Sequence, residues 1–143
     1  MTREEIVAEA KSWVGTPYLH QASLKGVACD CIGLIRGVYS RFVPDAVTVP
    51  LNYPSTWYLF RAEELLYTEI KPYLVEIASD EAKAGDILLF GFGKGPAAHC
   101  GIKNSDSMFI HSWMDVGKVV ETRLDDFWTS KIRFAFQIPG VFG

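Results

Sequence analysis

Residues 98–113 read AHCGIKNSDSMFIHSW, and this stretch determines which kind of sheet the chain can form. Two runs typical of β-strands, Ala98–Lys103 and Ser107–Trp113, stand on either side of the turn-forming triplet Asn104-Ser105-Asp106. This pattern predicts two neighbouring antiparallel strands joined by a short loop.

The predicted hairpin carries two histidines. If the triplet alone forms the loop, Lys103 lies opposite Ser107, and counting back along both strands pairs His99 with His111. Directly opposed residues share one face of an antiparallel sheet, with their Cβ atoms about 4.5–5.5 Å apart. The sequence therefore predicts two imidazoles side by side.

The β pattern continues on both sides of this hairpin, and helices are predicted before it. The predicted strands are Asp86–Phe92, Ala98–Lys103, Ser107–Trp113, Lys118–Arg123 and Ile132–Ile138. Helices followed by strands predict an α+β domain with an antiparallel sheet of about five strands. A length of 143 residues fits one domain that covers residues 1–143.

The first predicted helix begins at a capping box, Thr2-x-x-Glu5. Its apolar stripe at helical spacing consists of Ile6, Val7, Ala10, Trp13 and Val14. The segment Gly15-Thr16-Pro17 is expected to end the helix, because glycine accepts a left-handed backbone and proline cannot continue a helix.

The second predicted helix places a cysteine at its first turn. Asp30 is expected to cap it, and Leu34, Ile35 and Val38 repeat at helical spacing. Cys31 follows the cap directly. A helix N-terminus carries about half a positive charge and unpaired N–H groups, which together stabilise a thiolate.

The region after this helix is rich in proline. Pro44, Pro50 and Pro54 predict a loop over 43–56, and a third helix is expected within 57–70. The composition of the longer insert, 43–80, is compatible with part of a lid or with a docking face.

Composition excludes several classes of function. The net charge is −3 and there is no run of Lys or Arg, so neither nucleic-acid binding nor a polybasic membrane anchor is expected. No apolar run approaches the ~20 residues that span a bilayer, so no membrane insertion is expected. The N-terminus lacks the pattern of a secretory signal, which predicts synthesis in the cytoplasm with three reduced cysteines.

Two chemistries are open for the cysteines and histidines. The candidate ligands of a zinc site are Cys29, Cys31, His99, Cys100 and His111. However, Cys29-x-Cys31 is tighter than the usual ligand spacing, and adjacent His99 and Cys100 would point to opposite faces of a strand. We therefore favour Cys31 as a nucleophile, with the two histidines as its base and orienting group, and expect no metal or cofactor. Cys29 and Cys100 are then interpreted as buried thiols.

Other polar and aromatic residues have simpler interpretations. His20 lies in the loop after Tyr18 and has no mirrored partner, and Asp125–Asp126 is typical of a solvated turn. Tyr18 could donate a hydrogen bond near the thiolate or serve in packing. The tryptophans that could line a cleft, but whose spacing is usual for a core, are Trp57, Trp113 and Trp128.

Five short motifs occur in an order that is specific for one family. They are Gly15-Thr16-Pro17-Tyr18, Asp30-Cys31-Ile32-Gly33-Leu34, Ala84-Gly85-Asp86, His99-Cys100-Gly101-Ile102 and Phe109-Ile110-His111. Through them the chain closely resembles the NlpC/P60 cysteine peptidases of the papain-like group, over nearly its whole length. It departs from the family pattern at Ile32 (usually serine), Ala84 (usually proline) and Cys100 (usually valine).

The resemblance implies a role for each residue of the site. Cys31 would be the nucleophile, His99 the base and His111 the residue that orients the base. Tyr18 would lie beside the cysteine and bind substrate or the oxyanion. Asp30 is assigned the same role, binding of substrate or the oxyanion. Enzymes of this family cut peptidoglycan stem peptides, typically between D-γ-glutamyl and a diamino acid.

The resemblance also extends to a subset of the family found in phages and gene-transfer-agent clusters. Tyr18-x-His20-Gln21-Ala22-Ser23 and the insert around Trp57–Leu74 carry this likeness. It implies a partner in a phage-like tail tip or hub, and action in the periplasm or cell wall as part of that particle. A tail-tip component that is mainly structural, with reduced peptidase activity, is the alternative.

Overall fold

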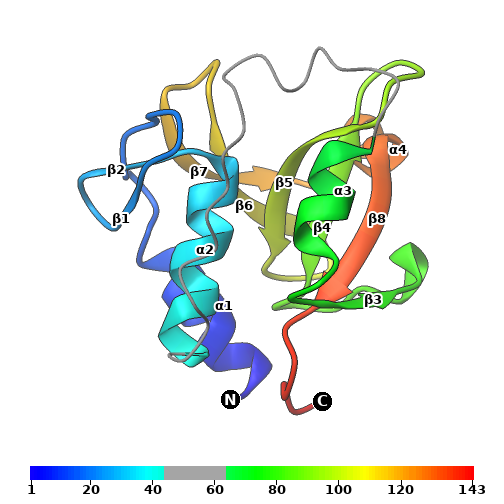
Figure 1. Cartoon of the computed structure of the whole chain (residues 1–143), viewed down its shortest axis with the longest axis horizontal. Helices are drawn as coiled ribbons and strands as arrows, with labels where there is room; N and C mark the ends of the chain where they lie inside the picture. Colours follow the sequence, from blue (N-terminus) through cyan, green and yellow to red (C-terminus); the bar gives the residue numbers. More distant parts are fainter. Residues whose placement is uncertain (44–63) are drawn as a thin grey trace.

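The computed structural model describes residues 1–43 and 64–143. Within these residues, three helices cover one face of an antiparallel sheet and a fourth helix lies against the other face (Figure 1). The loop predicted at 43–56 therefore lies almost entirely outside the described residues. Of the helix predicted within 57–70, the described part is α3 (Leu65–Ile70).

Helix α1 (Arg3–Lys11) begins where the capping box predicts. The Thr2 hydroxyl accepts a hydrogen bond from the Glu5 N–H at 3.1 Å. The side chains of Ile6, Ala10 and Trp13 are buried, whereas that of Val14 is 47% exposed. The predicted apolar stripe at helical spacing is thus wrong at Val14, because the helix ends at Lys11 and a turn carries the chain on to Gly15.

Helix α2 (Cys31–Phe42) confirms the second predicted helix, with Asp30 as its cap and Cys31 as its first residue. The apolar side chains of Leu34, Ile35 and Val38 are buried against the sheet and α1. Burial of this stripe is what holds the first turn, and so Cys31, in a defined position.

The main sheet has six antiparallel strands in the order β3-β8-β4-β5-β6-β7. Their bounds are β3 Val75–Ile77, β4 Ile87–Gly91, β5 Ala97–Lys103, β6 Met108–Trp113, β7 Lys118–Arg123 and β8 Ile132–Gln137. The predicted α+β class is confirmed, and five of these strands match the predicted ones to within one residue at each end.

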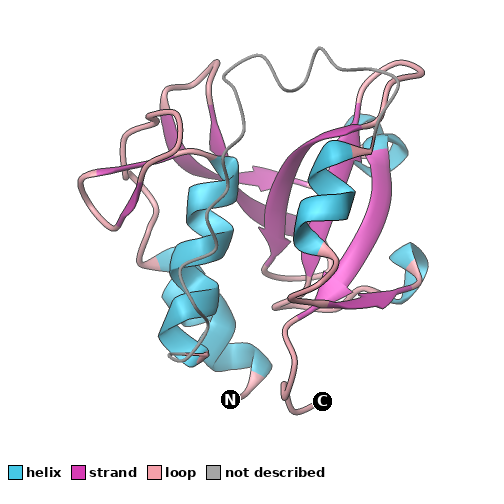
Figure 2. Cartoon of the chain, viewed as in Figure 1, coloured by secondary structure: helices cyan, strands magenta, loops and turns pink. Residues whose placement is uncertain are grey.

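The main sheet has one strand more than the five predicted runs, because the sequence does not mark β3. This edge strand has three residues, and its side chains are exposed or half-buried, so no buried face marks it in the sequence. The loop before α2 also holds a small hairpin, β1 (Ser23–Leu24) with β2 (Ala28–Cys29). Figure 2 shows this hairpin beside the start of α2, apart from the main sheet.

The predicted register of the β5–β6 hairpin was wrong by two residues. Lys103 lies opposite Phe109 and not opposite Ser107. His99 and His111 are therefore diagonal neighbours instead of a directly opposed pair. A shift of two residues leaves every side chain on its original face, whereas a shift of one would have separated the histidines.

The longer loop has a local cause. The Asn104 N–H donates to the Met108 carbonyl, and the Ser107 N–H donates to the Ser105 hydroxyl at 3.3 Å. The Ser107 carbonyl accepts the Leu124 N–H at 2.7 Å. Ser107 is thus engaged within the turn and with the end of β7, so it is withdrawn from the ladder to β5.

The segment at Asp125–Asp126 is not a solvated turn, as predicted, but the start of helix α4 (Asp126–Lys131). The Asp125 carboxylate caps this helix by accepting the Trp128 N–H at 3.0 Å. Burial of the Trp128 indole against the sheet stabilises a helix of six residues that is too short to be stable alone.

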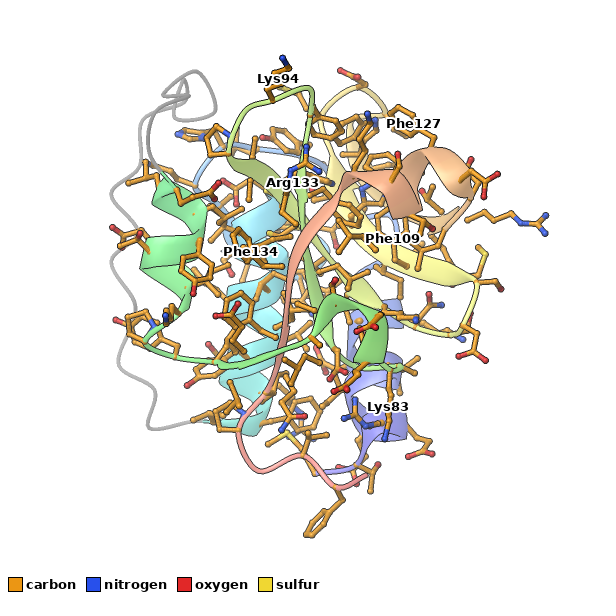
Figure 3. The ribbon with its side chains drawn as sticks, turned by 90° about the vertical axis from the view of Figure 1, so that its right-hand side faces the viewer. Lys83, Lys94, Phe109, Phe127, Arg133 and Phe134 are labelled. Atoms are coloured by element: carbon orange, nitrogen blue, oxygen red, sulfur yellow. The ribbon has the colours of Figure 1, made fainter. Side chains whose placement is uncertain are left out.

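The sheet separates two apolar clusters. On the face toward α1, α2 and α3, Cys31 packs with Leu89, Cys100 and Ile110. On the opposite face, Phe90 and Phe109 pack with Trp128. Figure 3 looks onto this second face, with α4 in front of the strands and α2 behind them.

Two further observations complete the fold. Arg3 at the start of α1 donates to the buried Asp86 carboxylate at 2.7 Å, which ties the helical layer to the start of β4. Among the described residues, we find no helix with the length and apolar character required to cross a membrane.

Candidate active site

Cys31 lies at the N-terminus of α2, where the helix leaves its first N–H groups without intrahelical partners. Its side chain is 6% exposed. The backbone positions Cys31 because Gly33, two residues later in the first turn, packs directly against the Ala22 carbonyl oxygen, with no room for a Cβ at that position. The helix dipole of this twelve-residue helix favours negative charge at Cys31.

Asp30 fixes the loop before Cys31. Its two carboxylate oxygens accept the N–H groups of Gly33 and Gln21, each at 2.7 Å, and the side chain is 3% exposed. The interpretation of Asp30 as a helix cap is confirmed. Since these backbone groups engage both oxygens, Asp30 connects the loop to the helix, and its assignment to substrate binding stays a prediction.

The two histidines are in direct contact. His99 Nε2 lies 2.7 Å from His111 Nδ1, and both side chains are buried. The rings of Trp113 and Trp128 flank the pair, with centroids 4.7 and 6.0 Å from that of His99. The side-by-side imidazoles predicted from the hairpin are therefore present, enclosed by aromatic rings.

Burial decides the charge of this pair. It lowers the pKa of His111 to about 3, and burial together with the neighbouring His111 lowers the pKa of His99 well below its ordinary value. Both imidazoles are thus neutral at neutral pH. A neutral imidazole has one N–H and one lone pair, so the contact between the rings consists of one donor and one acceptor.

The other two cysteines are buried thiols, as predicted. The side chain of Cys100 is in hydrogen-bond contact with that of Cys31, and its pKa is raised, first by burial and then by this contact. Burial likewise raises the pKa of Cys29 to about 11. Neither group is therefore a competing thiolate at neutral pH.

Cys31 and His99 meet β5 at neighbouring residues, since Cys31 contacts Cys100 and His99 directly precedes it. Cys31 packs with Cys100 on the α2 face, whereas the His99 ring lies among Phe90 and Trp128 on the α4 face. Among the hydrogen bonds of the described residues, none joins the Cys31 thiol to His99. His99 uses Nε2 for His111, so Nδ1 is the nitrogen that remains to exchange a proton with a thiol. Catalytic hydrogen bonds are often long before substrate binds.

The loop that carries Tyr18 pairs with the segment that leads to Cys31. The Tyr18 N–H donates to the Gly117 carbonyl at 2.8 Å, and Tyr18 pairs with Cys29 in a short parallel bridge. The Tyr18 side chain is half-buried, and its bridge partner Cys29 precedes Cys31 by two residues. His20 is placed with Nδ1 3.8 Å from the Asp30 carboxylate, a contact that the sequence did not indicate.

Sequence reasoning missed two residues of the site, Ser112 and Thr122. The Ser112 hydroxyl donates to the Cys29 carbonyl at 2.8 Å, and Thr122 Oγ1 lies 2.8 Å from His111 Nε2. Strand alternation places Ser112 on the face opposite His111, which was a usable signal for a polar group aimed at α2. Thr122 carries no such signal, because its position depends on the register of β6 with β7.

The Ser112 hydrogen bond predicts a measurable coupling between β6 and the segment before Cys31. Ser112→Ala should lower the free energy of unfolding by about 1 kcal/mol, because the buried Cys29 carbonyl loses one of its two donors and keeps the Leu19 N–H. A thermal melt should show a fall of a few degrees. Ser130→Ala, which removes an exposed hydroxyl, is the matched control. Equal melting temperatures of the two variants would contradict this role.

The zinc alternative concerns Cys29, Cys31, His99, Cys100 and His111. Within 1–43 and 64–143, the side chains of His, Cys, Asp and Glu do not gather in any group of three that could hold a metal ion. Cys100 and His99 point to opposite faces of β5, as strand alternation predicted.

A cysteine at the N-terminus of a helix that packs on an antiparallel sheet, with a histidine pair on that sheet, defines a papain-like fold. The NlpC/P60 family model matches residues 15–136. The chain belongs to the NlpC/P60 family.

Similar proteins agree with this assignment. The γ-DL-glutamyl hydrolase of Bacillus subtilis is 24% identical over 127 residues, which is 89% of this chain but 27% of that protein. The NlpC/P60 domain of the peptidoglycan hydrolase SagA superposes with a TM-score of 0.69 at 24% identity, covering 96% of this chain and all of that domain. RipD from Mycobacterium tuberculosis is a non-catalytic NlpC/P60 protein adapted to peptidoglycan binding. It superposes with a TM-score of 0.56 at 14% identity, covering 96% of this chain and 98% of RipD.

Proposed function

We propose that this chain is a cysteine endopeptidase that cuts peptidoglycan stem peptides between D-γ-glutamyl and a diamino acid. The observation that carries the proposal is the 2.7 Å contact between His99 and His111, next to the strand position that Cys31 contacts. Two neutral imidazoles joined in this way form a base and its orienting group, and the cysteine at a helix N-terminus supplies the nucleophile.

The proposed reaction proceeds in two stages. Cys31 passes its proton to His99 Nδ1 and attacks the scissile carbonyl, while the N-terminus of α2 stabilises the oxyanion. The His99 imidazolium then protonates the leaving amine. Water hydrolyses the resulting thioester and frees Cys31. Positioned oxyanion donors of this type are worth roughly 2.7–4 kcal/mol each.

The choice of substrate rests on the family and its members. One relative is by name a hydrolase of γ-DL-glutamyl bonds and another is a domain of a peptidoglycan hydrolase. The amide bond of a γ-linked D-glutamyl residue in a peptidoglycan stem peptide fits both names. The triad by itself defines a reaction on an amide, and the shape of the pocket defines which amide.

Mass spectrometry of defined muropeptides tests the proposal. Purified wild-type protein under reducing conditions should convert a tetrapeptide muropeptide into two fragments separated at the D-γ-glutamyl–diamino acid bond. Cleavage at another bond would replace the substrate assignment, and an intact muropeptide after incubation with folded protein would remove the peptidase assignment.

A second candidate is a peptidoglycan-binding or structural domain with reduced peptidase activity. The contact of the Cys31 side chain with Cys100, and not with His99, favours it, and RipD represents such a non-catalytic member of the family. In the same experiment, this candidate predicts that the protein binds the muropeptide without cleaving it. Delivery by a phage-like tail tip, and action within such a particle, stay predictions that rest on the sequence resemblance.

A further inference from the structure

Strand β7 adds a fourth side chain, that of Thr122, to the series Cys31, His99 and His111. In the β6–β7 ladder, His111 lies opposite Val120 and Phe109 lies opposite Thr122, so Thr122 is the diagonal neighbour of His111 on the same face. Its Oγ1 lies 2.8 Å from His111 Nε2. Together with the contact of His99 Nε2 to His111 Nδ1, this engages both ring nitrogens of His111.

The proton chemistry of His99 and His111 determines which atom donates in each of these hydrogen bonds. If His99 takes a proton from Cys31 at Nδ1, that nitrogen carries a lone pair beforehand, and the single hydrogen of neutral His99 lies on Nε2. His99 Nε2–H then donates to His111 Nδ1, so the hydrogen of His111 lies on Nε2 and points at Thr122. The Thr122 hydroxyl accepts it. The opposite direction would place a hydrogen on His99 Nδ1 and block the transfer from Cys31.

We propose that Thr122 is a positioning residue for this reaction: by accepting the His111 Nε2–H, it holds His111 with its Nδ1 lone pair toward His99. The inference rests on the proposed function of Cys31 and His99. It also gives Thr122 a greater effect in the transition state than in the resting enzyme. When His99 becomes an imidazolium, its N–H polarises His111, and hydrogen bonds linked to a charged group are stronger than neutral ones.

Two substitutions separate the hydroxyl from the shape of the side chain. Thr122→Val keeps the β-branched shape and removes the hydroxyl, and it should lower kcat for muropeptide cleavage by about 10- to 100-fold with KM changed less than about twofold. Thr122→Ser restores a hydroxyl and should recover kcat to within about threefold of wild type. Thr129→Val, which removes a hydroxyl bonded to the Leu124 carbonyl, is the matched control and should leave kcat unchanged.

A second readout does not require activity. Nitrogen-15 NMR of the imidazole side chains should show His111 protonated at Nε2 in the wild type and in Thr122→Ser, and a mixture of the two tautomers in Thr122→Val. This result would support the positioning role even if the muropeptide assay shows no cleavage, which would count against the peptidase proposal alone. His111 protonated at Nδ1 in the wild type, or Thr122→Val with an unaltered tautomer and kcat, would overturn the inference.

Discussion

Replacing Cys31 with alanine is expected to lower kcat/KM for muropeptide cleavage by about 10⁴- to 10⁶-fold, because it removes the atom that we propose forms the bond to the substrate. The fold should persist. Cys31 is 6% exposed within the core, and the loss of one sulfur atom costs on the order of 1 kcal/mol of apolar burial. The measurement is single-turnover cleavage of a defined muropeptide, with circular dichroism and a thermal melt of the same sample.

The other two cysteines provide the control for this prediction. Cys29→Ala and Cys100→Val remove buried thiols of raised pKa, and Cys100→Val introduces the residue usual in the family. We expect both variants to retain activity within about tenfold, since neither thiol is placed as a nucleophile. Substantial activity in folded Cys31→Ala, or a loss in Cys29→Ala as large as that in Cys31→Ala, would remove Cys31 from its assigned role.

The second large effect is a loss of stability in mild acid. The folded protein keeps His99 and His111 neutral, because burial lowers the pKa of both below the ordinary value of 6.5. The unfolded chain takes up a proton on each histidine as the pH falls through about 6.5, so it binds more protons than the folded protein. Stability is therefore full above this pH and is lost as the pH decreases toward the folded pKa values.

The size of this loss of stability follows from the two protons that the unfolded chain takes up on His99 and His111. Each histidine contributes a slope of up to about 1.4 kcal/mol per pH unit, so the free energy of unfolding should fall by about 4 kcal/mol between pH 7 and pH 5. Urea unfolding at intervals across this range measures it. His111→Asn removes one of the two groups and should reduce the slope by about half, whereas Ser130→Ala should not alter it. A flat curve in the wild type would show that the pair is charged or accessible when folded.

Local interactions explain why much of this site is visible in the sequence. A cap and a helical stripe involve residues a few positions apart, so Asp30 and the buried face of α2 predict where Cys31 lies. Alternation along β5 and β6 likewise predicts that His99 and His111 share a face, and a loop error of two residues does not alter this. The family motifs cover the same residues.

What the sequence by itself determined is therefore the α+β class, the helix that begins at Cys31, and the pairing of two histidines on one sheet. The tertiary structure alone decided the turn that displaced Ser107, the packing of Trp128 over the histidines, and the contact of Thr122 with His111. It also decided that Cys31 contacts the side chain of Cys100. The physical reason is that these features depend on which strand lies beside which and on what buries each face, and such contacts join residues far apart in the chain that no local pattern records.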